Sequence, residues 1–327
     1  MVQAARGVQE RLGSVQAVVE VRDARIPYSS GNPLLRQQVQ GSGRAHVVLF
    51  TKGDLIQRAD REALARHFQE HNPHIPSLVC STDRALDFAS KRKVCDKLLR
   101  LLGQHMPPSK FKTIPPTVMV VGMPNVGKSS LIRLLMSGAS RDANNASSVM
   151  QRGERPKVGA LPGVTRRIAG AEVALPTGGT RKPGAPASIS LLDTPGIMVP
   201  RVEDPHVGMK LALCGLVRDD TVPPDILADY LLFKLNHLQH TEQYMRLCNL
   251  PHPCDSIDDV LLRLASKLGK MVASDSQASK TRAARFLLRQ YREGRLGRAT
   301  LDRIRDDAET VALFAHEEWS EDQEGGK

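Results

Sequence analysis

The stretch that decides the fold is TVMVVGMPNVGKSSLIRLLM, residues 117–136. A run rich in β-branched residues comes first, a glycine-containing turn follows, and apolar residues at helical spacing complete the stretch. The turn GMPNVGKS, residues 122–129, matches GxxxxGK[ST] between a strand and a helix, which is the context in which this motif binds phosphate. The sequence therefore predicts a nucleoside triphosphate site in an α/β protein.

Each residue type in this phosphate loop has a chemical task. Gly122 and Gly127 allow the backbone to wrap closely around phosphate oxygens, so that successive N–H groups point at the anion. Lys128 is expected to reach the β- and γ-phosphates, and the Ser129 hydroxyl to ligate Mg²⁺. The remaining loop residues that we assign to nucleotide binding are Asn125, Val126 and Ser130.

A second phosphate motif lies downstream of a short apolar run at 189–192. DTPG, residues 193–196, supplies an acid at the end of a predicted strand, where P-loop proteins place a further Mg²⁺ contact. We expect Asp193 to make that contact and the backbone N–H of Gly196 to reach the γ-phosphate.

A third motif, PGVT at residues 162–165, lies between these two. Its threonine suits a switch residue that reaches Mg²⁺ only when a γ-phosphate is present. The predicted metal ligands are therefore Ser129, Asp193 and Thr165, and the predicted catalytic residues are Lys128, Asn125 and Thr165.

The predicted base-reading loop is TKGD, residues 51–54, at the end of an apolar run. The Asp54 carboxylate can accept hydrogen bonds from guanine N1–H and the N2 amine, a pattern that adenine cannot satisfy. The Lys52 stem would cover the ring, Gly53 completes the loop, and Thr51 stands where asparagine is usual. We expect Ser81, after the next apolar run, to support the guanine.

Short apolar runs alternate with segments of helical spacing in the first two thirds of the chain. The runs are 15–21, 45–51, 77–80, 117–121 and 189–192. A stretch with helical spacing, 60–70, lies between two of them. This alternation predicts a mostly parallel sheet flanked by helices.

From about residue 218 onward the strand signals stop. Segments 224–238 and 258–268 instead carry apolar residues at helical spacing. We therefore expect an α/β P-loop domain over 1–217 and an all-α domain over 218–327. Segments 138–163 and 176–187 have the composition of surface insertions.

The chain carries a large positive charge. Lys and Arg number 46 against 35 Asp and Glu, a net charge of +11, and such a field attracts polyanions. Nucleic acid is the favoured partner and an anionic membrane surface the alternative. No run approaches the roughly 18 apolar residues that span a bilayer. The five cysteines show no CxxC pair, which favours a reducing compartment over a disulfide framework.

One predicted helix concentrates arginine. In TRAARFLLRQYR, residues 281–292, four arginines recur at helical spacing and the apolar residues fall opposite them. We predict that this face contacts RNA phosphates, although a merely solvated face is the alternative. The four residues are Arg282, Arg285, Arg289 and Arg292.

The order of the motifs is unusual, since the base-reading loop precedes the phosphate loop. With DARIP at 23–27, this order resembles the circularly permuted YlqF/RbgA family of ribosome-assembly GTPases, and EDPHVGMKLALCGLVRDD, residues 203–220, is most similar to mitochondrial members. The resemblance implies GTP hydrolysis with Mg²⁺, K⁺ coordination by Asn125, and action on large-subunit rRNA and proteins. It further implies a monomer off the ribosome, in the mitochondrial matrix or peripheral to the inner membrane.

One further expectation concerns the water that attacks GTP. Ile197 stands where many GTPases carry the glutamine that orients this water, and an apolar side chain cannot do so. In the resembling family, a histidine just before the position that corresponds to Met1 is proposed for this role, and in mitochondrial members a targeting peptide precedes the segment that contains it. We therefore expect slow hydrolysis by this chain, unless the ribosome supplies the group in trans. The alternatives in function are a nucleotide-regulated binding module with little turnover and a membrane-surface GTPase.

Overall fold

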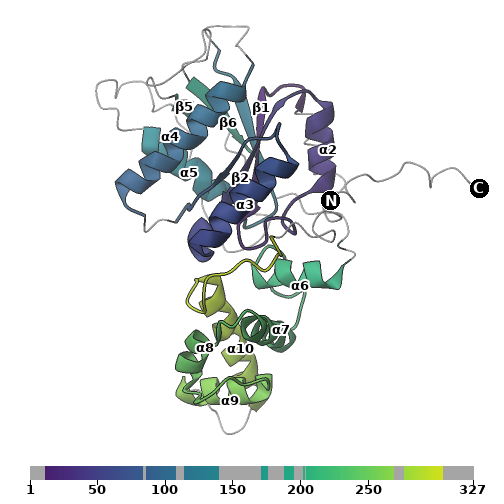
Figure 1. Ribbon diagram of the computed structural model, residues 1–327, viewed down its shortest axis with the longest axis vertical. Coiled ribbons are helices and arrows are strands. Elements are labelled where there is room, and N and C mark those ends of the chain that lie inside the picture. Colours follow the sequence, from purple (N-terminus) through teal and green to yellow (C-terminus); the bar gives the residue numbers. More distant parts are fainter. Residues whose placement is uncertain are drawn as a thin grey trace, which may run out of the picture.

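The computed structural model describes residues 12–83, 86–107, 114–139, 171–175, 188–194, 202, 204–268 and 276–304. A sheet flanked by helices forms one part of the described chain, and a bundle of helices forms the other (Figure 1). The two parts meet around a short helix, α6, which lies next to the sheet part (Figure 1).

The sheet has six described strands in the order β3-β2-β1-β4-β6-β5. Every neighbouring pair is parallel except β5 and β6, so the prediction of a mostly parallel sheet is confirmed. The strands are β1 (Ala17–Asp23), β2 (Ala45–Thr51), β3 (Ser77–Val79), β4 (Thr117–Gly122), β5 (Ala171–Ala174) and β6 (Ser188–Asp193).

Four helices cover the two faces of the sheet. Successive strand residues point to opposite faces, so Val19 packs in the cluster that holds Leu98 of α4, while Val18 packs with Leu35 of α2. Phe68 of α3 packs beside β2 on the same face as α2. The helices are α2 (Pro33–Gly41), α3 (Arg58–His71), α4 (Phe88–His105) and α5 (Lys128–Ala139).

The strand order explains how the motifs meet despite their order along the chain. β1 lies between β2 and β4, and β6 lies on the other side of β4. Because these strands are parallel, their carboxyl ends share one edge of the sheet. The base-reading loop, DARIP, the phosphate loop and Asp193 therefore converge at that edge.

Beyond β6, the described residues form only helices and their connections. Leu231, Leu264 and Leu287 contribute one buried residue each from α7, α9 and α10 to the bundle core. The expectation of a helical C-terminal region is confirmed. After α6 (Pro205–Leu213), which precedes the predicted boundary, its described helices are α7 (Pro224–His237), α8 (Thr241–Cys248), α9 (Ile257–Lys267) and α10 (Ser276–Arg292). Within the described residues, no helix is both long and apolar enough to cross a bilayer.

Several sequence expectations fall outside the described residues. Thr165, Gly196 and Ile197 are among them, as are nearly all of the two predicted insertions. These assignments stay predictions.

Candidate nucleotide-binding site

The phosphate loop has a backbone that its glycines make possible. Gly122 has a φ of +146°, and a Cβ there would lie 2.3 Å from the carbonyl oxygen of Val21. Gly127 has a φ of +108° and Asn125 a φ of +59°. These positive angles turn the chain back on itself between β4 and α5. The loop therefore opens toward the N-terminus of α5, which favours an anion.

Lys128 directs its charge into this loop. It is the first residue of α5, and its Nζ donates hydrogen bonds to the carbonyl oxygens of Gly122 at 3.0 Å and Met123 at 2.7 Å. The side chain is buried, and burial lowers the pKa of Lys128 to about 8, while nearby Asp193 opposes that shift. A phosphate would restore the favourable surroundings that the ammonium group lacks.

Asp193 and Ser129 face each other across the strand ends. The Ser129 Oγ lies 3.5 Å from Asp193 Oδ2, and Asp193 Oδ1 is buried without a hydrogen-bond partner among the described residues. Burial raises the pKa of this carboxyl, and Lys128 offsets part of the effect. A buried carboxylate oxygen without a donor, beside a hydroxyl, suits an oxygen-coordinated divalent cation such as Mg²⁺. The predicted pairing of these two residues is thus geometrically available.

Thr51 joins the base-reading loop to the phosphate loop. The side chain is fully buried, and its Oγ1 lies 2.5 Å from the carbonyl oxygen of Val126 and 3.1 Å from that of Arg22. A hydroxyl in place of the usual asparagine therefore still ties the two loops together.

The rest of the base-reading loop is held by backbone contacts. Lys52 is in the left-handed region with a φ of +57°, and Gly53 N–H donates to the carbonyl oxygen of Cys80 at 2.9 Å. Ser81, the next residue, accepts a bond from the Asp83 N–H. The structure therefore brings Ser81 beside the loop that carries Asp54, as the sequence predicts, whereas their contact with guanine stays a prediction.

The DARIP segment also lies at this edge of the sheet, although its residues were not predicted to take part in nucleotide binding. Asp23 is fully buried and binds both Arg25, at 2.7 Å, and Lys52, at 2.8 Å. Burial alone would raise the pKa of Asp23, but the two cations outweigh it and hold the pKa well below its ordinary value. An acid and a base two residues apart at a strand end are the sequence signal for this pair.

Asn125 points toward the helical part of the chain. Its Nδ2 donates to the carbonyl oxygen of Gly215, which follows α6, at 2.8 Å. The amide nitrogen is thereby engaged, which directs the amide oxygen elsewhere. Carbonyl oxygens of this kind are ligands for hard cations.

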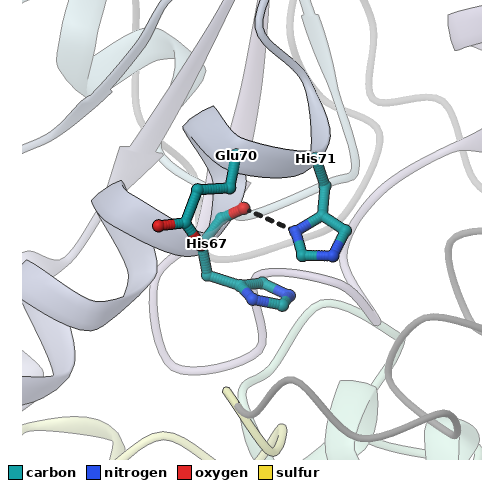
Figure 2. A group of neighbouring side chains, drawn as sticks. All are labelled: His67, Glu70 and His71. Atoms are coloured by element: carbon teal, nitrogen blue, oxygen red, sulfur yellow. Dashed lines mark hydrogen bonds between the residues drawn. The ribbon is translucent and has the colours of Figure 1, made fainter.

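A histidine and carboxylate group on α3 is a feature that the motif reading missed (Figure 2). Potential ligand atoms of His67, Glu70 and His71 lie within 4.8 Å of one another, and His71 Nδ1 is 2.9 Å from the carbonyl oxygen of His67. The spacing HFQEH at 67–71, which places the three on neighbouring helix turns, is the signal for it. We assign this group no part in the nucleotide chemistry.

The arginine face of α10 differs in one member from its prediction. Arg282, Arg285 and Arg289 are exposed, and the apolar residues on the other side of the helix are buried, as predicted. Arg292 instead donates to the carbonyl oxygens of Leu213 and Ala212, at 3.0 and 2.9 Å. Its long side chain reaches the end of α6, so its guanidinium is bound there, whereas those of the other three arginines are exposed.

Comparisons with known proteins give consistent relatives. Residues 117–244 match the family model of the 50S ribosome-binding GTPase. Mitochondrial ribosome-associated GTPase 1 of Mus musculus is 33% identical over 314 residues, which cover 93% of this chain and 88% of the mouse protein. Mitochondrial GTPase 1 of Schizosaccharomyces pombe is 30% identical to this chain, and the match covers 92% of this chain and 86% of the yeast protein. The crystal structure of GNP-bound YlqF from T. maritima has the same fold, with a TM-score of 0.55 and 20% sequence identity. The match covers 93% of this chain and 100% of the YlqF chain.

Proposed function

We propose that this chain, which belongs to the family of mitochondrial ribosome-associated GTPase 1, hydrolyses GTP as an assembly factor for the large subunit of the mitochondrial ribosome. The observation that supports this most is the meeting of four motifs at one sheet edge, with Lys128 buried beneath the phosphate loop. The names of the relatives supply the mitochondrial ribosome as partner.

The residues at the carboxyl-end edge of the sheet have different roles in the proposed reaction. The loop backbone and Lys128 bind the phosphates and stabilise negative charge that develops during transfer to water. Ser129 and Asp193 would hold Mg²⁺, and Thr165 would join them in the GTP state. When bound, Mg²⁺ would neutralise negative charge on the phosphates. Asp54 and Lys52 would select and cover the guanine.

Asn125 supports a role for a monovalent cation. Because its nitrogen donates to Gly215, the amide oxygen is the end that can ligate K⁺ beside the phosphates. We expect hydrolysis to be about tenfold faster in K⁺ than in Na⁺, since an added positive charge stabilises the transition state. Initial rates in matched chloride buffers check this, and Asn125→Ala should remove the difference. Equal rates for the unmodified chain in the two buffers would contradict the proposed role.

The α10 surface supports contact with RNA. Changing Arg282, Arg285 and Arg289 together to glutamine should weaken binding to large-subunit rRNA and reduce the steepness of its salt dependence by about 2 to 3 log units per log unit of salt. Filter binding across a salt series measures the slope. The matched control changes three exposed arginines of the sheet part to glutamine: Arg58, Arg92 and Arg100. An equal loss of slope in the control would show that net charge, not this face, is responsible.

Co-sedimentation separates the proposed function from its alternatives. The full chain is incubated with mitochondrial large-subunit particles, small-subunit particles or anionic liposomes, each with GTP, GDP or no nucleotide. We expect GTP-dependent binding to large-subunit particles. Binding that favours liposomes would support a membrane-surface GTPase. Particle binding that depends on GTP without particle-stimulated turnover would instead support the nucleotide-regulated binding module.

A further inference from the structure

The end of α6 has a fixed geometry. Gly215 adopts a φ of +73°, its N–H donates to the Ala212 carbonyl oxygen at 3.0 Å, and the Leu216 N–H donates to that of Leu211 at 2.9 Å. This pair of bonds is the Schellman ending of a helix. It sets the directions of the carbonyl groups that follow.

Side chains from three distant segments donate hydrogen bonds to the backbone carbonyl oxygens of four successive residues. Arg292 of α10 binds those of Ala212 and Leu213, Arg25 of DARIP binds that of Cys214 at 3.2 Å, and Asn125 of the phosphate loop binds that of Gly215. Carbonyl groups at the C-terminal end of a helix carry partial negative charge, so guanidinium and amide groups stabilise them. We call these four carbonyls and their three partners the α6 junction.

The nucleotide site touches this junction at two points. Asn125 belongs to the phosphate loop itself. Arg25 is held by Asp23, and the same carboxylate holds Lys52 of the base-reading loop. A change at the phosphate loop therefore reaches the end of α6 through one contact, and a change at the base-reading loop reaches it through three.

The helical bundle contacts the α6 junction through two further interactions. Arg292 also pairs with Asp219 at 2.8 Å, and the Arg25 guanidinium lies 5.8 Å from the ring centre of Tyr291 on α10. A Cβ at Gly215 would lie 3.3 Å from Arg292 Nε, so the glycine also leaves room for the Arg292 side chain.

We propose that the α6 junction couples the bundle to the nucleotide site. The Gly215 carbonyl positions Asn125, and Arg292, bound to the carbonyls of Ala212 and Leu213, fixes the end of α6 that presents the Gly215 carbonyl. Arg292 and Gly215 are thus positioning residues that act on the phosphate loop without touching nucleotide. The inference rests on the proposed GTP site. Because such coupling is reciprocal, a partner bound to the bundle would change nucleotide affinity, and nucleotide would change affinity for that partner.

A double-mutant cycle on nucleotide affinity tests the junction. The full chain is titrated with a fluorescent, non-hydrolysable GTP analogue and Mg²⁺ in K⁺ buffer. Arg292→Ala should weaken binding about fivefold. In the Asn125→Ala background it should have no further effect, because the group that receives the constraint is gone. Arg263→Ala, at an exposed arginine of α9 outside the predicted RNA face, is the matched control and should bind like the unmodified chain.

Each result has a defined meaning. Unchanged affinity in Arg292→Ala, or losses that multiply with those of Asn125→Ala, would overturn the junction while leaving the GTP site intact. Failure of the unmodified chain to bind the analogue would overturn the GTP site and the inference together. If Arg292→Ala does not fold, Asp219→Asn weakens the contact of Arg292 from an exposed position, and its smaller loss should also vanish when Asn125 is replaced by alanine.

Discussion

Replacing Lys128 by alanine is expected to weaken GTP binding by about a hundredfold or more, because a charged hydrogen bond to the phosphates is lost from a buried site. Hydrolysis of any GTP that still binds should fall by a further factor of about 100. Titration with a fluorescent GTP analogue and single-turnover rates measure the two effects. Lys97→Ala, an exposed lysine on α4, is the matched control and should change neither quantity.

Proton uptake distinguishes this role of Lys128 from simple support of the loop. Since the pKa of Lys128 is lowered to about 8 in the free protein, the amine is largely neutral at pH 8.5. Phosphate should raise that pKa again, so GTP binding at pH 8.5 takes up a fraction of a proton, and almost none from this group at pH 7. Calorimetry in buffers of different ionisation enthalpy measures it. Uptake that persists in Lys128→Met would assign the proton to another group.

The strands of the sheet could be predicted from sequence because their signals are local. All five predicted apolar runs, including 45–51 and 117–121, correspond to strands within about two residues. β5 (Ala171–Ala174) could not, since AEVA is short and two of its four residues are alanine, which has little preference for strands. α2 (Pro33–Gly41) did carry a signal in its Asn32 cap and the proline that follows.

The candidate site, like the sheet, could be predicted from the sequence only in part. The roles that we expect for Lys128 and Ser129 can be predicted from residue type and spacing, because a phosphate loop of this sequence fixes its own geometry. The α6 junction does not, because Asn125 and Gly215 are 90 residues apart and the acceptor is a backbone carbonyl that any residue possesses. Helical spacing also groups Arg292 with the exposed arginines. Only the three-dimensional structure shows that its guanidinium binds carbonyl oxygens at the end of α6.

Changing Asp54 to asparagine should convert the base preference from guanine to xanthine. The carboxylate lies in a short turn, Gly53–Leu55, that the Gly53 bond to Cys80 fixes, and no side chain in the described part of the chain donates to it. Its two oxygens can therefore accept the two bonds that we expect guanine to donate. An amide presents a donor where an acceptor is required, so GTP affinity should fall by about a hundredfold or more.

Xanthosine triphosphate provides the test that loss of function alone cannot. Its C2 oxygen accepts where guanine donates, so the amide that Asp54→Asn introduces can donate to it, and this nucleotide should bind the variant at least as well as GTP binds the unmodified chain. Competition of both nucleotides against the fluorescent analogue measures the switch. Asp60→Asn, the same change on α3, should leave the preference for GTP unaltered. If Asp54→Asn lost both nucleotides equally, or if ATP and GTP bound the unmodified chain alike, Asp54 would not be the group that reads the base.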